Sequence, residues 1–391
     1  MGLVVQRSVL ALPVAVATFA GALAYAGCGS SEDGATASVD AGPEASPPVV
    51  DDAALPDAAP KGCEVDRAED GMWQHLRCAG LYSDFAAKVL DPTLRPYKPA
   101  LELWSDGAAK QRWISIPPGT KIDTSNIDEW VFPNGTKAWK EFRLDGKRIE
   151  TRLYEKGDSG AWRHATFVWN ADESDAVRTT GGVRIARGGP DVPPYEIPND
   201  NQCNACHAGR KDRVLGFEMV SLGLAGAEGL TLAALVAEGL LSSPPPSTTL
   251  SFPEDVTGKA AAALAWTHVS CGPCHNRSPD ANGVQSSVYL LTRGSSLLAA
   301  DGGPATVASL DAFATTVGKT TMTEIPDAGG ATFSIIKAGD PSASLASYLS
   351  GRRVGPTGSP NEKEQMPPIV TRLVDANGHA SFDAWISALP P

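Results

Sequence analysis

The chain has 391 residues, of which 42% are hydrophobic and 20% are charged, and its formal net charge is −12 at pH 7. This acidic balance argues against nucleic acid and against an anionic membrane surface as binding partners. Roughly 330 residues follow the N-terminal segments described next, a length that suffices for two domains.

Residues 1–27 have the features of a signal peptide. Arg7 ends a short basic segment, and an apolar run rich in Ala, Val and Leu follows it over residues 8–24. That run is too short for a comfortable membrane span. Its end resembles a bacterial lipobox, with Tyr25 where a Leu is usual, and in that case Cys28 would be acylated. Ordinary cleavage nearby is the alternative. We expect an exported protein, anchored by lipid in the cell envelope and facing the periplasm or the outside.

Residues 28–61 consist mainly of Ala, Asp, Pro, Gly and Ser, with almost no large apolar side chain. Such a segment cannot bury enough surface to offset the loss of chain entropy. It is therefore expected to be a disordered tether that only spaces the anchor from the folded body.

The use of the seven cysteines predicts one disulfide. Cys28 would be acylated, and four more cysteines belong to the two motifs described below. Cys63 and Cys78 remain, and in an oxidising compartment they are expected to form a disulfide. Two free buried thiols are the alternative.

Residues 62–242 have mostly the pattern of strands and turns. Apolar and polar residues alternate over 111–116, 136–144, 148–154 and 161–169, with turn signals at 133–135 and 156–160. A further short strand is expected at 129–132, and a helix over 226–241. We expect an antiparallel sheet with several aromatic side chains, which would suit a flat apolar cofactor.

Two copies of Cys-x-x-Cys-His, at 203–207 and 271–275, are the most informative feature of the chain. This motif is the attachment signature of c-type haem, in which two thiols bind the haem vinyl groups and the histidine binds the iron. The spacing makes about one helical turn, so both sulfurs lie along one porphyrin edge. We expect two covalently bound haem c groups. Their attachment residues would be Cys203 and Cys206 with His207, and Cys271 and Cys274 with His275.

Two other site types share parts of this pattern. Cys-Gly-Pro-Cys at 271–274 is also the thioredoxin redox motif, which follows a strand, but here an Ala-rich, helix-favouring stretch precedes it at 258–266. A zinc site would have its two cysteine pairs about 12 to 20 residues apart. The two pairs here are much more widely separated, so haem is the preferred interpretation.

The segment 242–247 is rich in Ser and Pro and marks a domain boundary. Beyond it, residues 250–391 have the pattern of short helices, with one leading from about residue 253 into the second motif and others at 343–350 and 382–389. The order of helix, haem motif, loops, Met-Pro-Pro and terminal helix resembles a class I cytochrome c domain. Residues near 280–335 would be an insertion.

Met366 is the candidate sixth ligand of the second haem. It stands in Met-Pro-Pro at 366–368, which resembles the segment that presents a methionine to the iron in class I cytochromes c. The prolines stiffen the loop that must hold the thioether. With His275 on the other side, the iron would have a raised potential suited to electron transfer. A packing role for Met366 is the alternative.

The first haem has no comparable segment. Met219 or His164 is the candidate sixth ligand, and for each of them ordinary packing is the alternative. More remote candidates from the sequence are His75, His268, His379 and Met322.

Two family resemblances extend this interpretation. Residues 132–136, Lys140, Glu141, 160–162 and the first motif resemble the β-sheet cytochromes that include the hydroxylamine-oxidising, lysine-crosslinked haem proteins. This resemblance implies a sheet over a five-coordinate haem that could bind a small molecule, and Lys140 or Lys137 would match the crosslinking lysine. A second resemblance is carried by residues 103–107, 117–120, 150–153, both motifs and 366–368. These residues resemble a family of exported bacterial dihaem c-type cytochromes of poorly defined function.

The sequence therefore predicts an α+β protein. An antiparallel β-sheet haem-binding domain (62–242) precedes a mostly α-helical class I cytochrome c-like domain (250–391). The expected function is electron transfer between redox proteins of the periplasm or cell envelope, with lipid as the only link to the membrane and without nucleic acid. The alternative is a redox enzyme that acts on a small nitrogen or peroxide species at an open first haem.

Overall fold

The structure is a computed structural model that describes residues 62–188, 192–298, 305–321, 333–353 and 364–391. The predicted signal peptide and tether, Cys28 and Met322 lie outside these residues. The described residues all belong to one compact unit. In the described part of the chain, no helix is both long enough and apolar enough to cross a membrane.

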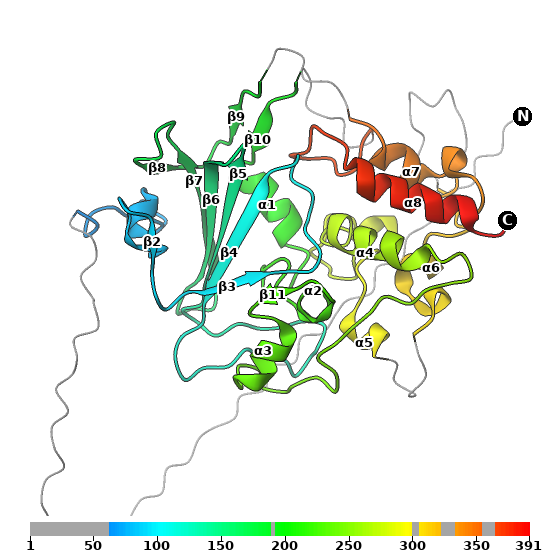
Figure 1. Cartoon of the computed structure of the whole chain (residues 1–391), viewed down its shortest axis with the longest axis horizontal. Coiled ribbons are helices and arrows are strands. Elements are labelled where there is room, and N and C mark those ends of the chain that lie inside the picture. The colour runs from blue at the N-terminus through cyan, green and yellow to red at the C-terminus, as the bar shows by residue number, and fades with distance from the viewer. Residues whose placement is uncertain (1–61, 189–191, 299–304, 322–332, 354–363) are drawn as a thin grey trace, which may run out of the picture. The chain divides into compact units, whose positions relative to one another are not determined.

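Eleven strands occur among the described residues (Figure 1). They are β1 (Tyr82–Asp84), β2 (Val89–Leu90), β3 (Arg95–Lys98), β4 (Ala109–Ser115), β5 (Lys137–Leu144), β6 (Lys147–Lys156), β7 (Trp162–Trp169), β8 (Ala176–Thr179), β9 (Val183–Ile185), β10 (Tyr195–Ile197) and β11 (Glu228–Gly229). The helices follow mainly in the second half of the chain. They are α1 (Asp200–His207), α2 (Met219–Gly223), α3 (Leu232–Ala237), α4 (Ala260–Ser270), α5 (Gly294–Leu297), α6 (Asp311–Ala314), α7 (Leu345–Ser350) and α8 (Ala376–Ala388).

Seven strands form one antiparallel sheet in the order β11-β3-β4-β5-β6-β7-β8. The predicted α+β class and the predicted antiparallel sheet are confirmed. Strands β4 to β7 fall where the alternating patterns predict them, and the turn signals at 133–135 and 156–160 lie at strand ends. Antiparallel neighbours joined by short turns need no crossover, so local pattern was sufficient to place them.

Several predicted elements differ from the structure. The helix expected from about residue 253 begins at Ala260, and the last helix, expected at 382–389, already begins at Ala376. Residues 129–132 form only an isolated bridge, between Val131 and Asp123, and no strand. The helix expected over 226–241 is confined to α3, because Glu228 and Gly229 pair with β3 instead. Gly229 has a positive φ of 69°, a backbone conformation that does not continue a helix.

One face of the sheet packs on the N-terminal segment. Trp113, Trp139, Leu153 and Ala165 stand directly opposite one another across β4 to β7. They belong to a hydrophobic cluster with residues of the segment 72–82, such as Leu76. Because side chains alternate between the faces of a strand, the residues between them project from the other face, where α1 lies.

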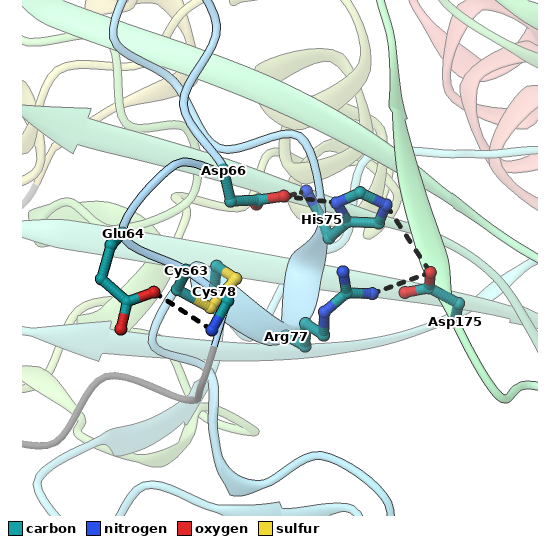
Figure 2. The surroundings of a disulfide bond; sticks show 8 residues. Cys63, Glu64, Asp66, His75, Arg77, Cys78 and Asp175 are labelled. Atoms are coloured by element: carbon teal, nitrogen blue, oxygen red, sulfur yellow. Dashed lines mark hydrogen bonds and ion pairs between the residues drawn. A yellow bond between two sulfur atoms is a disulfide. The ribbon is translucent and has the colours of Figure 1, made fainter.

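A disulfide fastens the start of this N-terminal segment (Figure 2). The structure joins Cys63 to Cys78, the pair that the sequence predicts, with 5.4 Å between their Cα atoms. Nearby, His75 Nδ1 lies 2.5 Å from an Asp66 carboxylate oxygen, and Arg77 donates to Asp175 at 3.0 Å. The segment is thus tied to itself and to the end of the sheet.

The largest hydrophobic cluster joins the sheet to the helices. It contains Ile114 and Ala138 of the sheet, Leu264 of α4 and Trp385 of α8. The core therefore continues across the predicted domain boundary near residue 245. Figure 1 shows α1 between the sheet and the helices α4 to α8.

Candidate haem sites

The first motif lies on α1, at the sheet face that carries Tyr154. Asn199 caps this helix: its side chain accepts from the Gln202 amide, and the Gln202 side chain accepts from the Asn199 amide, both at 2.9 Å. This reciprocal cap satisfies two amides that would otherwise lack a partner. The Cys203 thiol contacts Thr166 of β7, so the motif is seated on the sheet.

His207, the last residue of α1, is oriented for metal binding. Its ring stacks on Tyr154 of β6, with 4.3 Å between centroids and 16° between planes. Nδ1 donates to the carbonyl oxygen of Arg213 at 2.5 Å. Since the proton is on Nδ1, the lone pair that a metal needs is on Nε2. Burial lowers the pKa of His207 to about 3, so the imidazole is neutral, as a ligand must be.

Asp212 fixes the loop that carries this carbonyl. Its carboxylate accepts from Lys156 Nζ at 2.8 Å, from Trp162 Nε1 at 2.7 Å and from the Phe132 amide at 2.5 Å. Both Asp212 and Lys156 are buried. Removing one partner of a buried ion pair is strongly destabilising, about 3–5 kcal/mol. The loop after α1 is therefore held firmly against the sheet.

The second motif continues the end of α4. The amides of Cys271 and His275 donate to Thr267 and Cys271 at 3.0 and 2.9 Å, which extends the helical turn through the motif. The His275 ring has two polar partners, Ser286 Oγ at 3.3 Å from Nδ1 and the Val288 carbonyl. Burial lowers its pKa. Two polar contacts thus hold this imidazole in place.

The two motifs are in direct contact. A Cβ added to Gly209, just after the first motif, would lie 2.0 Å from the carbonyl oxygen of Pro273 inside the second. The Asn276 side chain donates to that same oxygen at 3.0 Å. On the other side, Cys274 Sγ lies 3.7 Å from the carbonyl oxygen of Ala205. Only a glycine allows this approach, because any Cβ at 209 would overlap the facing backbone.

The second cysteines of the two motifs are neighbours. The contact with the Cys274 thiol, together with burial, raises the pKa of Cys206, and the same contact lowers the pKa of Cys274. Burial raises the pKa of Cys203, and it raises that of Cys271 to about 12. None of these four cysteines is in a disulfide. All four thiols are thus free for covalent attachment.

A small cavity, partly open to solvent, lies beside the second motif and the loop after the first. Arg112 and Lys140 line it from the sheet, Leu215 from the loop after the first motif, and Pro273 from the second motif. Among the described residues, Lys140 belongs to this lining, whereas Cys206 and His207 do not. The free thiols and the neutral imidazole of His207 have the chemistry that covalent haem attachment requires.

Met366 lies in a small hydrophobic cluster with Phe333 and Leu349, and its amide donates to the Leu349 carbonyl at 2.9 Å. Within the described residues this cluster does not include His275. The assignment of Met366 as the sixth ligand of the second haem stays a prediction.

Met219 and His164, the two candidate sixth ligands of the first haem, both lie in packing contacts with other side chains. Met219 is 1% exposed in the main hydrophobic cluster, with its sulfur against Gly294. His164 stacks on Tyr154 with 5.2 Å between centroids, so the tyrosine ring lies between His164 and His207. Both placements agree with the packing alternatives, and the sixth ligand of the first haem stays a prediction.

The remaining candidates differ in their position. Lys140 lines the cavity, whereas Lys137 stands three residues earlier on β5, projects from the opposite face and lies 4.0 Å from Glu155. His268 and His379 already have carboxylate neighbours, Glu218 at 3.4 Å and Asp383 at 3.4 Å. In the part of the chain that the structure describes, no group of three or more His, Cys, Asp or Glu is arranged to hold a bare metal ion.

Comparison with known proteins gives no further information on the site: no protein-family model matches the chain, and no curated protein or solved structure matches it either.

The sequence did not indicate that Gly209, Tyr154 and the Arg213 carbonyl are parts of the site. A glycine two residues after a motif histidine gives a weak signal for close backbone approach. Carbonyl orientation has no sequence signal.

Proposed function

We propose that the protein is an exported dihaem c-type cytochrome that transfers electrons between redox partners in the periplasm or cell envelope. One observation carries the proposal: two Cys-x-x-Cys-His motifs from distant parts of the chain pack against each other, with Cys206 beside Cys274. A chain that attaches two one-electron centres at adjacent sites is built for electron transfer.

The chain's own residues have distinct roles in this proposal. Cys203 and Cys206 would hold the first haem, with His207 on its iron. Cys271 and Cys274 would hold the second, with His275 and Met366 as axial ligands. When bound, c-type haem supplies a one-electron iron couple whose potential depends on the axial ligands and on burial. The stacked tyrosine and the Arg213 carbonyl orient His207 for that task.

Within this one compact unit, the proposal assigns a haem to each half of the chain. The sheet and α1 would form the first, and residues 250–391 the class I cytochrome c-like second. In the second, α4 packs on the terminal helix α8, where Trp266 Nε1 donates to Asp375 at 2.8 Å and the Trp266 ring lies 5.5 Å from that of Phe382. Helix α4, which precedes the second motif, and the terminal helix α8 thus pack against each other.

Export and a lipid anchor at Cys28 belong to the same proposal, and they rest on the sequence alone. The Cys63–Cys78 disulfide supports an oxidising compartment, since disulfides persist there and are rare in the cytosol. The partners would be other redox proteins of the cell envelope.

A second function has one observation in its favour. Met219 and His164 both have packing surroundings, which favours an open sixth position on the first iron. Such a position could take a small nitrogen or peroxide species, and the protein would then be a haem redox enzyme.

The test is mass spectrometry of the full chain expressed in a host that attaches c-type haem. The expected result is two covalent haems, with one thioether lost in each of Cys206→Ser and Cys274→Ser. Fewer than two haems in the unchanged chain would overturn the proposal. Carbon monoxide then separates the two functions: a six-coordinate first haem that ignores it in the reduced state rejects the enzyme.

A further inference from the structure

Three cations stand side by side on the sheet face that carries the first motif. Arg112 of β4, Lys140 of β5 and Arg152 of β6 occupy directly opposite positions. Like charges at such positions destabilise a sheet, and the penalty grows where water is excluded. A row of this kind persists only if anions compensate it.

The carboxylates of the protein compensate the row at its two ends. Glu150, fully buried, accepts from Arg152 Nε at 2.8 Å and Nη2 at 2.7 Å. Glu102 accepts from Arg112 Nη2 at 2.9 Å and lies 3.7 Å from Lys110. Glu102 is thus shared by Arg112 and Lys110, and Glu150 is paired with Arg152.

At the centre of the row, Lys140 forms no ion pair with a carboxylate among the described residues, and Glu102 acts on it only at longer range. Among the described residues, Lys140 Nζ makes neither a hydrogen bond nor an ion pair, and it lies 4.9 Å from the Phe142 ring. Burial, together with the neighbouring cations, lowers the pKa of Lys140 well below its usual value, and a bound anion would raise it again. Arg112 is 4% exposed, and its Nη1 is buried without a hydrogen-bond partner. Both side chains line the cavity beside the motifs. Arg112 and Lys140 therefore bring donors without a hydrogen-bond partner to one cavity.

We propose that Arg112 and Lys140 form a binding site for a carboxylate or another small oxyanion in the cavity beside the second motif and the loop after the first. An arginine with a free Nη1 and a lysine ammonium supply charge-assisted donors, which are roughly twice as strong as neutral ones. Arg210 and the carboxylate of Glu218 also line the cavity. Glu218 is already committed to other partners: it lies 3.4 Å from His268 and accepts from the amides of Val220 and Ser221. The anion relieves the repulsion within the row and satisfies Nη1 in the same step.

The oxyanion has two possible sources with the same chemistry. One is a carboxylate of the first haem itself, and this case rests on the proposed function. The other is a free oxyanion from solution, and its binding does not depend on what the protein does with electrons. The experiment below separates them.

Calorimetry on the full chain, with formate, nitrite and inorganic phosphate as separate probes, gives the first readout. The second is the reduction potential of each haem. The variants are Lys140→Met and Lys140→Arg, and the control is Lys147→Met, which removes a cation from an exposed position at the turn end of β6. Lys140→Met removes an unpaired, enclosed charge and is expected to fold at least as stably as the unchanged chain.

If the anion is free, one probe binds with a 1:1 ratio, at least tenfold more weakly to Lys140→Met, and almost unchanged to Lys140→Arg and Lys147→Met. If the anion is a haem carboxylate, none of the probes binds, but Lys140→Met lowers the potential of one haem, because a positive charge near the iron is lost. If no probe binds and the potentials of both haems are unchanged in Lys140→Met, with two haems still attached, the proposed anion site is rejected. A haem count below two overturns the proposed function instead, and the calorimetry still decides on a free anion.

Discussion

Gly209→Ala tests whether the two motifs are in contact as the structure places them. The new Cβ would lie 2.0 Å from the Pro273 carbonyl oxygen, and ordinary contact begins at 3.4 Å. The segments must therefore separate by about 1.4 Å along this line, at the cost that overpacking brings, about 1–3 kcal/mol. Because Cys206 and Cys274 stand on these segments, their thiols separate as well.

The assay is urea unfolding of the full dihaem chain, followed by far-ultraviolet circular dichroism. Gly181→Ala is the matched control, since a Cβ there has no atom within 4 Å and should change the unfolding free energy by less than about 0.5 kcal/mol. The Soret circular dichroism of the two haems gives a second readout, because coupling between two chromophores depends steeply on their separation. Equal unfolding midpoints in both variants, with an unchanged Soret signal, would refute the contact.

Three further predictions concern other parts of the chain. Met366→Ala should lower the reduction potential of one haem only, by loss of the thioether ligand, and redox titration without a change in either haem would reject the ligand assignment. Replacing Cys63 and Cys78 by Ser should destabilise the fold by about 3 kcal/mol in the chain-entropy model, since the disulfide spans 15 residues; urea unfolding with an unchanged haem spectrum measures this. A hydrogen bond from Arg178 lowers the pKa of Asp70 to about 2. The stability from this pair is therefore complete above about pH 4 and is lost as the pH falls towards 2, by at most about 1 kcal/mol at an exposed carboxylate. The difference in urea midpoint between the unchanged chain and Asp70→Asn should then disappear on acidification.

The fold could be predicted where local pattern decides it. The alternation that buries Trp139 and Leu153 on one face identifies β5 and β6, and the turns between strands carry their own signals. The strand expected at 129–132 did not form, because apolar pattern alone does not supply a pairing partner. Pairing of β11 with β3 joins residues far apart in the chain, and no local pattern contains that information.

The candidate site was only partly accessible from the sequence. The cysteines and histidines of the two motifs, at 203–207 and 271–275, can be recognised in the sequence because covalent haem attachment requires a fixed spacing. The cation row around Lys140 depends on the register of three strands, and register shifts by one residue would move it to the other face. Contact between the motifs depends on how α1 packs against the turn after α4, which is a tertiary property.

The contacts between the halves of the chain explain why the motif pair is a property of the whole fold. The Arg372 amide donates to Asp106 at 2.9 Å, and its Nε donates to Glu196 at 2.8 Å. The Leu250 amide donates to Gly223 at 2.8 Å, inside the core that both halves share. Separating the halves would expose this core and leave buried donors and acceptors unpaired, each at a cost of about 1–3 kcal/mol. The distance between the two haem attachment sites is therefore set by packing and not by the linker, and both sites have to be studied in the intact chain.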